Sequence, residues 1–236
     1  MTDRLDQVLQ SGVLRVGTTM DTPVFSMRDA SGKLHGFDMD ALETLAKALG
    51  VKIEYVKMTF VSMLGDLAAD KFDIAMSGMG RTYERARTAT FSKPYMRYGK
   101  LLMIRSADKD KYKSLADLDK PGLKIAYNQG GLNDRFANTE FRQATPASYP
   151  SNELATADLL SGKVDAQVQD STAAVYLSRQ NPKLAAMAPD HVFHPVHVAI
   201  LMRREDRALC DFINIWIDQI EMDGTLAKIR TKWLGP

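Results

Sequence analysis

Short apolar runs of strand length alternate with helical stretches in the first part of the chain. Residues 13–19 and 74–76 have the composition of buried strands, and residues 51–55 alternate apolar and polar side chains as a half-buried strand does. Residues 39–49 place apolar side chains on one helix face, and Asp38 stands where an N-cap is expected. This alternation predicts an α/β fold with a mostly parallel sheet.

A second series of strands and helices begins after a charged segment. Residues 106–113 are rich in lysine and aspartate, which indicates a solvated loop where the chain enters a second lobe. We expect lobe 1 to comprise residues 1–101 plus 197–236, and lobe 2 to comprise residues 102–196, with two hinge crossings between them. The C-terminal segment carries apolar side chains at helical spacing, which predicts helices packed on the core of lobe 1.

Two segments of the chain resemble each other. Residues 67–74 and 159–166 both have the pattern of a helix end, a turn and a strand. We infer that the two lobes are related. If the lobes face each other, the strand ends at Ser77 and Asp170 line one binding cleft.

Composition narrows the class of protein. The chain has 236 residues, a formal net charge of +2 and interspersed acidic and basic residues, so nucleic acid is not an expected partner. Cys210 is the single cysteine, which excludes an internal disulfide and a cysteine-based metal site. No apolar run is long enough to span a membrane, and Met1–Arg4 lacks the apolar core of a secretory signal.

The segment from Phe72 to Arg85 is the strongest candidate for a binding site. An apolar strand leads into Ser77, Gly78 and Gly80, whose small side chains leave backbone N–H groups accessible to a ligand. Arg85 follows at a helix start, where its planar guanidinium can hold a carboxylate with two hydrogen bonds. On spacing alone, an arginine on a solvated helix face is an equal alternative.

Other polar residues leave two interpretations open. Asp170 ends a strand and is either a ligand acceptor or the N-cap of the following helix. The turn from Asn128 to Asn133 offers N–H groups to an anion, but any tight strand-to-helix loop could use its two glycines. His191, His194 and His197 lie on a predicted strand, where side chains three apart point to opposite faces, so we expect no metal site.

Motifs for covalent or metal catalysis do not occur in the sequence. There is no G-x-S-x-G, no P-loop and no H-E-x-x-H. We therefore expect neither a metal nor a cofactor.

Several motifs together resemble the family 3 extracellular solute-binding proteins of the amino-acid-binding type. Within this superfamily, the chain is most similar to the periplasmic cyclohexadienyl (prephenate/arogenate) dehydratases. The resemblance covers nearly the whole chain and implies a two-lobed periplasmic-binding-protein fold of type II. It rests on residues 5–19, Gly36-Phe37-Asp38-Met39-Asp40, residues 72–78, Glu84-Arg85-x-Arg87, Phe91-Ser92-x-Pro94-Tyr95 and Trp233-Leu234.

The resemblance implies roles for individual residues. In amino-acid-binding members, the arginine matching Arg85 takes the ligand α-carboxylate, and the aspartate matching Asp170 takes the α-ammonium. Two hydroxyl positions that usually assist the carboxylate are Gly80 and Leu132 here, and each missing hydrogen bond to a charged group costs about 1.5–3 kcal/mol if nothing replaces it. The site therefore departs from the pattern that binds an ordinary α-amino acid.

The dehydratase branch supplies an alternative function. Lys100, Asn128 and Asn133 match substrate-contacting positions of those enzymes, and Lys100 and Asn128 are the catalytic candidates if the chain is one. The family's general-acid glutamate, however, corresponds to Ala173. Loss of a general acid typically lowers a rate by about 10²–10⁴-fold, so we favour a binding protein over a carbon-oxygen lyase.

The sequence thus predicts a periplasmic protein that captures a small carboxylate-bearing, amino-acid-like solute between two lobes and delivers it to an ABC importer. Its secretion signal is not part of this sequence, and a sensor role is a further alternative. The expected ligand-binding residues are Asp21, Phe25, Phe60, Ser77, Gly78, Arg85, Lys100, Asn128, Leu132, Asn133 and Asp170.

Overall fold

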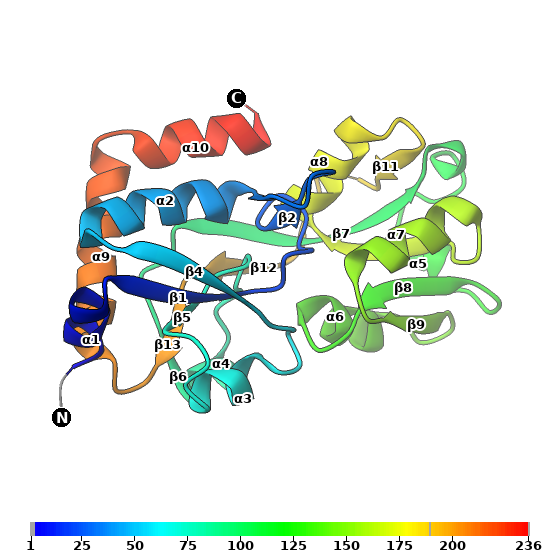
Figure 1. Cartoon of the computed structure of the whole chain (residues 1–236). Coiled ribbons are helices and arrows are strands. Elements are labelled where there is room, and N and C mark those ends of the chain that lie inside the picture. Colours follow the sequence, from blue (N-terminus) through cyan, green and yellow to red (C-terminus); the bar gives the residue numbers. More distant parts are fainter. Residues whose placement is uncertain (1–2, 189, 236) are drawn as a thin grey trace. The chain divides into compact units, whose positions relative to one another are not determined.

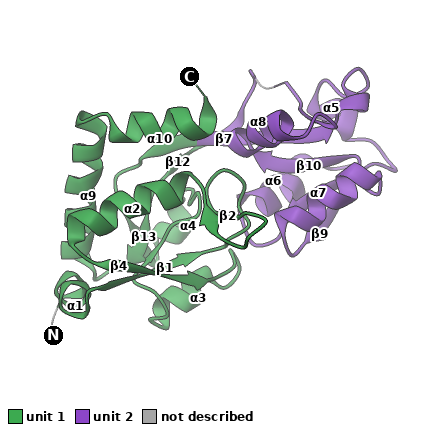
Figure 2. Cartoon of the chain, turned by 45° about the horizontal axis from the view of Figure 1, so that its top comes forward, with its two compact units in different colours: residues 1–97, 196–236 green, residues 98–195 purple. Residues whose placement is uncertain are grey.

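The chain folds into two compact units, each with its own mixed sheet and helices on both faces (Figures 1 and 2). The structure is a computed structural model, and it describes residues 3–188 and 190–235. Unit 1 contains the chain up to Arg97 and again from Val196, and unit 2 contains Tyr98–Pro195. The predicted lobe boundaries, 101/102 and 196/197, lie slightly further along the chain than these two crossings.

Unit 1 contains the N-terminal elements and the C-terminal helices. The elements before the first crossing are α1 (Arg4–Ser11), β1 (Val13–Thr18), β2 (Met27–Arg28), β3 (Leu34–His35), α2 (Phe37–Leu49), β4 (Lys52–Lys57), α3 (Met63–Ala68), β5 (Ile74–Ala75), α4 (Tyr83–Ala86) and β6 (Ala89–Phe91). After the second crossing come β13 (Leu201–Arg203), α9 (Arg207–Met222) and α10 (Thr225–Leu234).

Unit 2 begins within β7 (Met96–Arg105) and ends within β12 (Phe193–Val198), and these two crossing strands pair with each other. Between them come the 3-10 helix η1 (Ser106–Asp108), α5 (Leu115–Leu118), β8 (Lys124–Asn128), α6 (Leu132–Glu140), β9 (Thr145–Tyr149), α7 (Asn152–Ser161), β10 (Ala166–Asp170), α8 (Ser171–Gln180) and β11 (Leu184–Ala186).

Each sheet has three parallel strands on one side and a strand antiparallel to its neighbours next to them. In unit 1 the order is β4-β1-β5-β13-β6, with β4, β1 and β5 parallel and β13 antiparallel to its neighbours. In unit 2 the order is β11-β7-β10-β8-β9, with β10, β8 and β9 parallel and β7 antiparallel to its neighbours. The predicted two-lobed α/β fold is confirmed.

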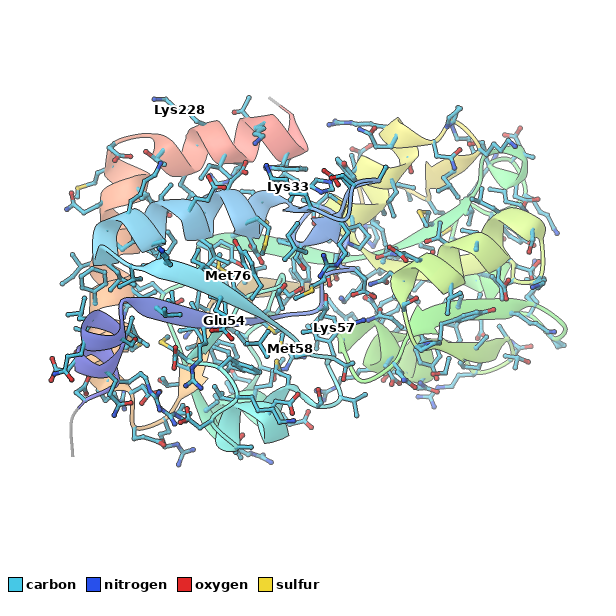
Figure 3. The ribbon with its side chains drawn as sticks, in the orientation of Figure 1. Lys33, Glu54, Lys57, Met58, Met76 and Lys228 are labelled. Atoms are coloured by element: carbon cyan, nitrogen blue, oxygen red, sulfur yellow. The ribbon has the colours of Figure 1, made fainter. Side chains whose placement is uncertain are left out.

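The cores follow the apolar pattern of the sequence. In unit 1, α2 and α10 cover one face of the sheet and α3 the other (Figure 1), and Leu14 and Val16 of β1 are fully buried between them. Charged side chains such as Glu54, Lys57 and Lys228 lie outside, whereas Met58 and Met76, which follow β4 and β5, are buried (Figure 3). In unit 2, Phe136, Ile125 and Val168 belong to one buried cluster.

The internal repeat seen in the sequence recurs in the hydrogen bonds. Lys71 pairs with Asp66, at 2.7 Å, and Lys163 pairs with Asp158, at 2.9 Å, at the same spacing in each unit. Asp73 accepts from the Arg15 N–H at 2.8 Å as Asp165 accepts from the Lys124 N–H at 2.9 Å. The turn residues also match, since Asp70 and Gly162 both have a left-handed backbone, with φ of 57° and 81°.

This equivalence places the two candidate strand ends at corresponding positions. β5 is the middle strand of the unit 1 sheet and runs parallel to β1, and β10 is the middle strand of the unit 2 sheet and runs parallel to β8. The carboxyl ends of parallel strands in open α/β sheets are the usual positions for ligands. Ser77 and Asp170 therefore stand at equivalent ends of their own units.

Candidate functional site

Arg85 is held in a fixed orientation in unit 1. Thr82 caps α4 by accepting from the Arg85 N–H at 3.2 Å, which sets the start of the helix. The Arg85 side chain is buried, its Nη1 donates to the Gly80 carbonyl oxygen at 2.9 Å, and its guanidinium carbon lies 6.0 Å from the centre of the half-buried Phe60 ring. A solvated surface arginine, the alternative left open by the spacing, is therefore wrong.

The Ser77 hydroxyl belongs to a buried group of hydroxyls. Its Oγ lies 2.9 Å from Thr19 Oγ1 and 2.8 Å from Ser26 Oγ, and Thr19 Oγ1 lies 2.6 Å from Thr22 Oγ1. All four residues are buried. These bonds fasten the loop after β1 to the end of β5. Ser77 thus shapes the floor of the predicted site through its own protein contacts.

Asp38 is a buried carboxyl group that the sequence interpretation assigned incorrectly. The N-cap of α2 is Gly36, and Asp38 is the second residue of the helix with a fully buried side chain. Its Oδ2 accepts from the Gly78 N–H at 2.7 Å, and its Oδ1 accepts from the Tyr95 hydroxyl at 2.8 Å. Burial raises the pKa of Asp38 to about 7, although both donors act in the opposite direction.

The only sequence feature that could have indicated a buried anchor at Asp38 was its position in Gly36-Phe37-Asp38-Met39-Asp40, near the start of a helix. An acidic residue close to a helix start fits a cap and a buried anchor equally well, and only burial separates the two. The Gly78 N–H, which the sequence offered to a ligand, donates to Asp38.

Phe25 and Asp21 lie in the loop after β1. Phe25 is fully buried and packs edge-on against Phe37, with ring centres 6.4 Å apart. A Cβ on Gly78 would lie 2.7 Å from the Phe25 ring, so glycine is required for this contact. Phe25 therefore supports the turn after β5 from inside unit 1, while Asp21 is half-buried.

Unit 2 brings together four of the residues predicted from the sequence. Lys100 on β7 lies directly opposite Asp170 on β10, and its Nζ donates to Asp170 Oδ1. The same Nζ donates to Asn133 Oδ1 at 2.7 Å, and Asn133 Nδ2 donates to Asn128 Oδ1 at 2.7 Å. All four side chains are buried. Leu132, the first residue of α6, precedes Asn133 in the chain and is half-buried.

This network changes the interpretation of Asp170. Asp170 is the N-cap residue of α8, but its side chain makes no capping hydrogen bond. Its carboxylate instead pairs with Lys100, a partner that sequence spacing could not reveal because the two residues are far apart in the chain.

Two of the positions that depart from the family patterns, Gly80 and Ala173, are held within the packed structure. Gly80 forms an isolated antiparallel bridge with Val198. Ala173, at the position of the general-acid glutamate, is fully buried in α8. The sequence of α8, Ser171–Gln180, contains neither aspartate nor glutamate.

The histidines near the second crossing do not form a metal-binding group. His194 Nε2 lies 3.2 Å from Glu140 Oε1, and the His191 ring packs edge-on against Phe193. Within residues 3–188 and 190–235, no cluster of at least three histidine, cysteine, aspartate or glutamate side chains could hold a metal ion.

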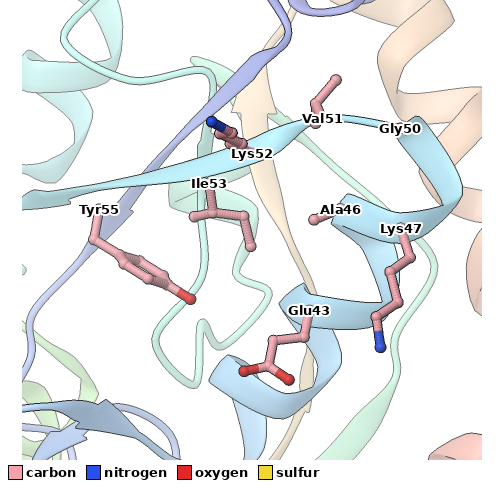
Figure 4. A pocket seen from close by; sticks show the side chains of 8 residues that line it. All are labelled: Glu43, Ala46, Lys47, Gly50, Val51, Lys52, Ile53 and Tyr55. Carbon is pink, nitrogen blue, oxygen red and sulfur yellow. The ribbon is translucent and has the colours of Figure 1, made fainter.

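A shallow pocket lies elsewhere on unit 1 (Figure 4). It has a volume of about 660 Å³ and lies between the end of α2 and the edge strand β4. Its lining residues are Glu43, Ala46, Lys47, Gly50, Val51, Lys52, Ile53 and Tyr55. None of the predicted ligand-binding residues belongs to it.

The fold and the polar clusters at equivalent strand ends are those of a solute-binding protein. Residues 14–236 match the family described as bacterial extracellular solute-binding proteins, family 3, and the chain belongs to this family. The family works outside the cytoplasm, in the periplasm or extracellular space. In the described part of the chain, no helix is both long and apolar enough to cross a bilayer.

Individual relatives include both an enzyme and transport proteins. The cyclohexadienyl dehydratase of Pseudomonas aeruginosa is 36% identical over 231 residues, which covers 98% of this chain and 86% of the enzyme. The ABC transporter arginine-binding protein 1 of Escherichia coli K12 is 28% identical over 224 residues, covering 93% of this chain and 90% of that protein.

The crystal structure of an ancestral amino acid-binding protein, a precursor of cyclohexadienyl dehydratase, has a TM-score of 0.92 at 36% identity and covers 98% of this chain and 99% of that one. These comparisons support the resemblance inferred from the motifs.

Proposed function

We propose that this protein binds a small carboxylate-bearing, amino-acid-like solute reversibly in the periplasm and delivers it to a membrane ABC importer. The observation that carries the proposal is the buried, oriented guanidinium of Arg85 at the carboxyl end of the unit 1 sheet. A planar guanidinium can bind a carboxylate with two parallel hydrogen bonds. The transport assignment is supported by relatives such as the arginine-binding protein of Escherichia coli.

Unit 2 supplies the other polar groups in this proposal. Lys100 takes one oxygen of the Asp170 carboxylate, and a ligand ammonium would bind the second oxygen, Oδ2. Asn128 and Asn133 keep Lys100 in place, and they tune the choice of ligand together with Asp21, Phe60 and Leu132. Because Lys100 already neutralises much of the Asp170 charge, we expect carboxylate recognition to contribute more affinity than ammonium recognition.

Replacing Arg85 by alanine should weaken binding of the solute roughly 100-fold, which corresponds to about 2.7 kcal/mol. The loss follows from removing two charge-assisted hydrogen bonds to the carboxylate. The solute would first be found by a thermal-shift screen of amino acids, opines, dicarboxylates, betaines and prephenate. Affinities of the wild type and variant would then be measured by calorimetry.

Arg87→Ala is the matched control for this measurement, because Arg87 follows the same short helix but is exposed. We expect Arg87→Ala to bind as the wild type does. Unchanged affinity in Arg85→Ala, with the fold intact by circular dichroism, would remove Arg85 from the site and the proposal with it.

A dehydratase is the second candidate function. The Lys100, Asn133 and Asn128 network and the 36% identity to the Pseudomonas enzyme favour it. The chemistry needs a proton for the departing oxygen, and Ala173 cannot supply one. We expect the purified protein not to convert prephenate to phenylpyruvate or arogenate to phenylalanine. Turnover that depends on Lys100 would replace the transport proposal with this one.

A further inference from the structure

The buried carboxyl group of Asp38 closes a ring of contacts in unit 1. Asp38 bonds to Gly78 and Tyr95, the Tyr95 ring stacks on Phe37 at 6.0 Å and 14°, and Phe37 packs against Phe25. Phe25 completes the ring by packing against Gly78. We call these five residues the Asp38 ring. It is a closed path, so a change at Asp38 acts on Gly78 and Tyr95 together.

The segment Ser77–Arg81, here called the ligand turn, is also bonded to the strand that re-enters unit 1. The Ala199 N–H donates to the Met79 carbonyl at 2.9 Å, and the Arg81 N–H donates to the His197 carbonyl at 2.7 Å. Gly80 and Val198 form a bridge between these two bonds. The ligand turn therefore follows any displacement of the segment just after the second crossing.

Tyr95 connects the first crossing to the segment just after the second crossing. It precedes β7, through which the chain leaves unit 1 after Arg97. Its N–H donates to the Val198 carbonyl at 3.0 Å, and its own carbonyl accepts from Arg230 Nη2 at 3.2 Å. Hydrogen bonds thus connect the Asp38 ring to the segments at both crossings and to the ligand turn.

We propose that Asp38 is a positioning residue, and that the gain or loss of one proton on its carboxyl group adjusts the ligand turn together with Tyr95 and Val198 at the two crossings. This inference deepens the proposed function, on which it rests for the role of the ligand turn. Asp38 itself does not touch the solute in this proposal.

The effect of protonating Asp38 follows from the two hydrogen-bond donors around its carboxyl group. The ionised carboxylate accepts from the Gly78 N–H and the Tyr95 O–H. On taking up a proton from solvent, Asp38 becomes a donor on one oxygen. The Gly78 N–H can only donate, so the Tyr95 hydroxyl must turn and accept. Protonation therefore weakens the charge-assisted bond to Gly78 and reverses the bond to Tyr95.

The pKa of Asp38, raised to about 7 by burial, places this exchange at neutral pH. Charged groups on the surrounding elements are engaged with other partners. Asp40 of α2 accepts from Lys232 of α10 at 2.6 Å, Arg230 of α10 bonds to the Tyr95 carbonyl, and Arg85 of α4 bonds to the Gly80 carbonyl. Asp38 is therefore the group of this ring expected to titrate.

The test uses the protein without ligand, so its result is independent of the solute. Amide signals of Gly78, Arg81 and Ala199 would be followed by NMR from about pH 5.5 to 8.5, a window that brackets the raised pKa. We expect the three amides to shift together with one midpoint near pH 7. In Asp38→Asn the shift should vanish, because the amide cannot ionise.

Two further variants make the outcome decisive. Tyr95→Phe removes a donor that favours the ionised form, so the midpoint should rise by about one pH unit, and this result stands even if Asp38→Asn does not fold. Asp119→Asn is the matched control, because Asp119 also accepts backbone N–H groups but is held ionised by them, with a lowered pKa. It should leave the three midpoints unchanged.

Two results would overturn the proposal. Gly78 titrating while Arg81 and Ala199 do not would show that Asp38 is a local anchor without coupling to the crossing. No titration of Gly78 in this window would show that Asp38 keeps one protonation state. Neither result bears on whether Arg85 binds a carboxylate, so failure here and failure of the proposed function are distinguishable.

Discussion

Replacing Lys100 by methionine is expected to lower the free energy of unfolding by about 3–5 kcal/mol, the cost of leaving one charge of a buried pair without its partner. The Lys100 and Asp170 side chains are only 4% and 10% exposed, and they face each other across β7 and β10. Methionine keeps the apolar stem of lysine but removes the ammonium. Urea denaturation at neutral pH, followed by circular dichroism, gives the difference.

Lys93→Met provides the matched control. Lys93 also forms an ion pair, with Asp218, but these side chains are 53% and 45% exposed. Exposed pairs contribute about 0–1 kcal/mol, so this variant should be nearly as stable as the wild type. The double variant Lys100→Met with Asp170→Leu should recover most of the lost stability. If Lys100→Met alone costs no more than Lys93→Met, the buried pair is not a structural element of unit 2.

Replacing Gly36 by alanine is the second large effect that we expect, with a loss of about 3–5 kcal/mol from backbone strain and overpacking together. Gly36 has φ of 145°, which side chains rarely adopt, and an added Cβ would lie 2.2 Å from the Phe25 carbonyl oxygen. That carbonyl cannot move away without cost, because it accepts from the Asp38 N–H at 3.1 Å. Thermal and urea unfolding would measure the loss.

Gly32→Ala separates the effect of backbone strain from the effect of overpacking. Gly32 also has a positive φ, 82°, but an added Cβ meets nothing within 4 Å. We expect it to cost only about 1–2 kcal/mol, the penalty for a left-handed conformation. Equal losses in the two glycine variants would mean that the contact between Gly36 and Phe25 does not restrict the structure.

Much of the fold could be predicted because apolar periodicity reports local structure directly. The repeated pattern at residues 67–74 and 159–166 corresponds to equivalent strands in the two units. Arg85 and Asp170 could be selected as candidate binding residues, since Arg85 follows a glycine-rich turn and Asp170 ends a strand. These signals lie within a few residues of each other, where spacing is informative.

The partners of the site residues could not be predicted in the same way. Asp38 had the position of a helix cap, and its burial against Tyr95 depends on how α2 packs near the start of β7. Ser77 and Gly78 were expected to offer hydrogen bonds outward, but the Ser77 hydroxyl and the Gly78 N–H bond within unit 1. Composition does not distinguish a donor that faces a ligand from one that faces its own core.

The sequence by itself determined the family, the alternation of strands and helices, and which side chains are candidates for carboxylate binding, because local patterns and motifs specify these. The tertiary structure decided which charges pair and which are buried. Lys100 meets Asp170, and Asp38 meets Gly78 and Tyr95, only after distant strands and helices have packed. Burial sets both the strength of these contacts and the pKa of Asp38, and burial is a property of the packed chain.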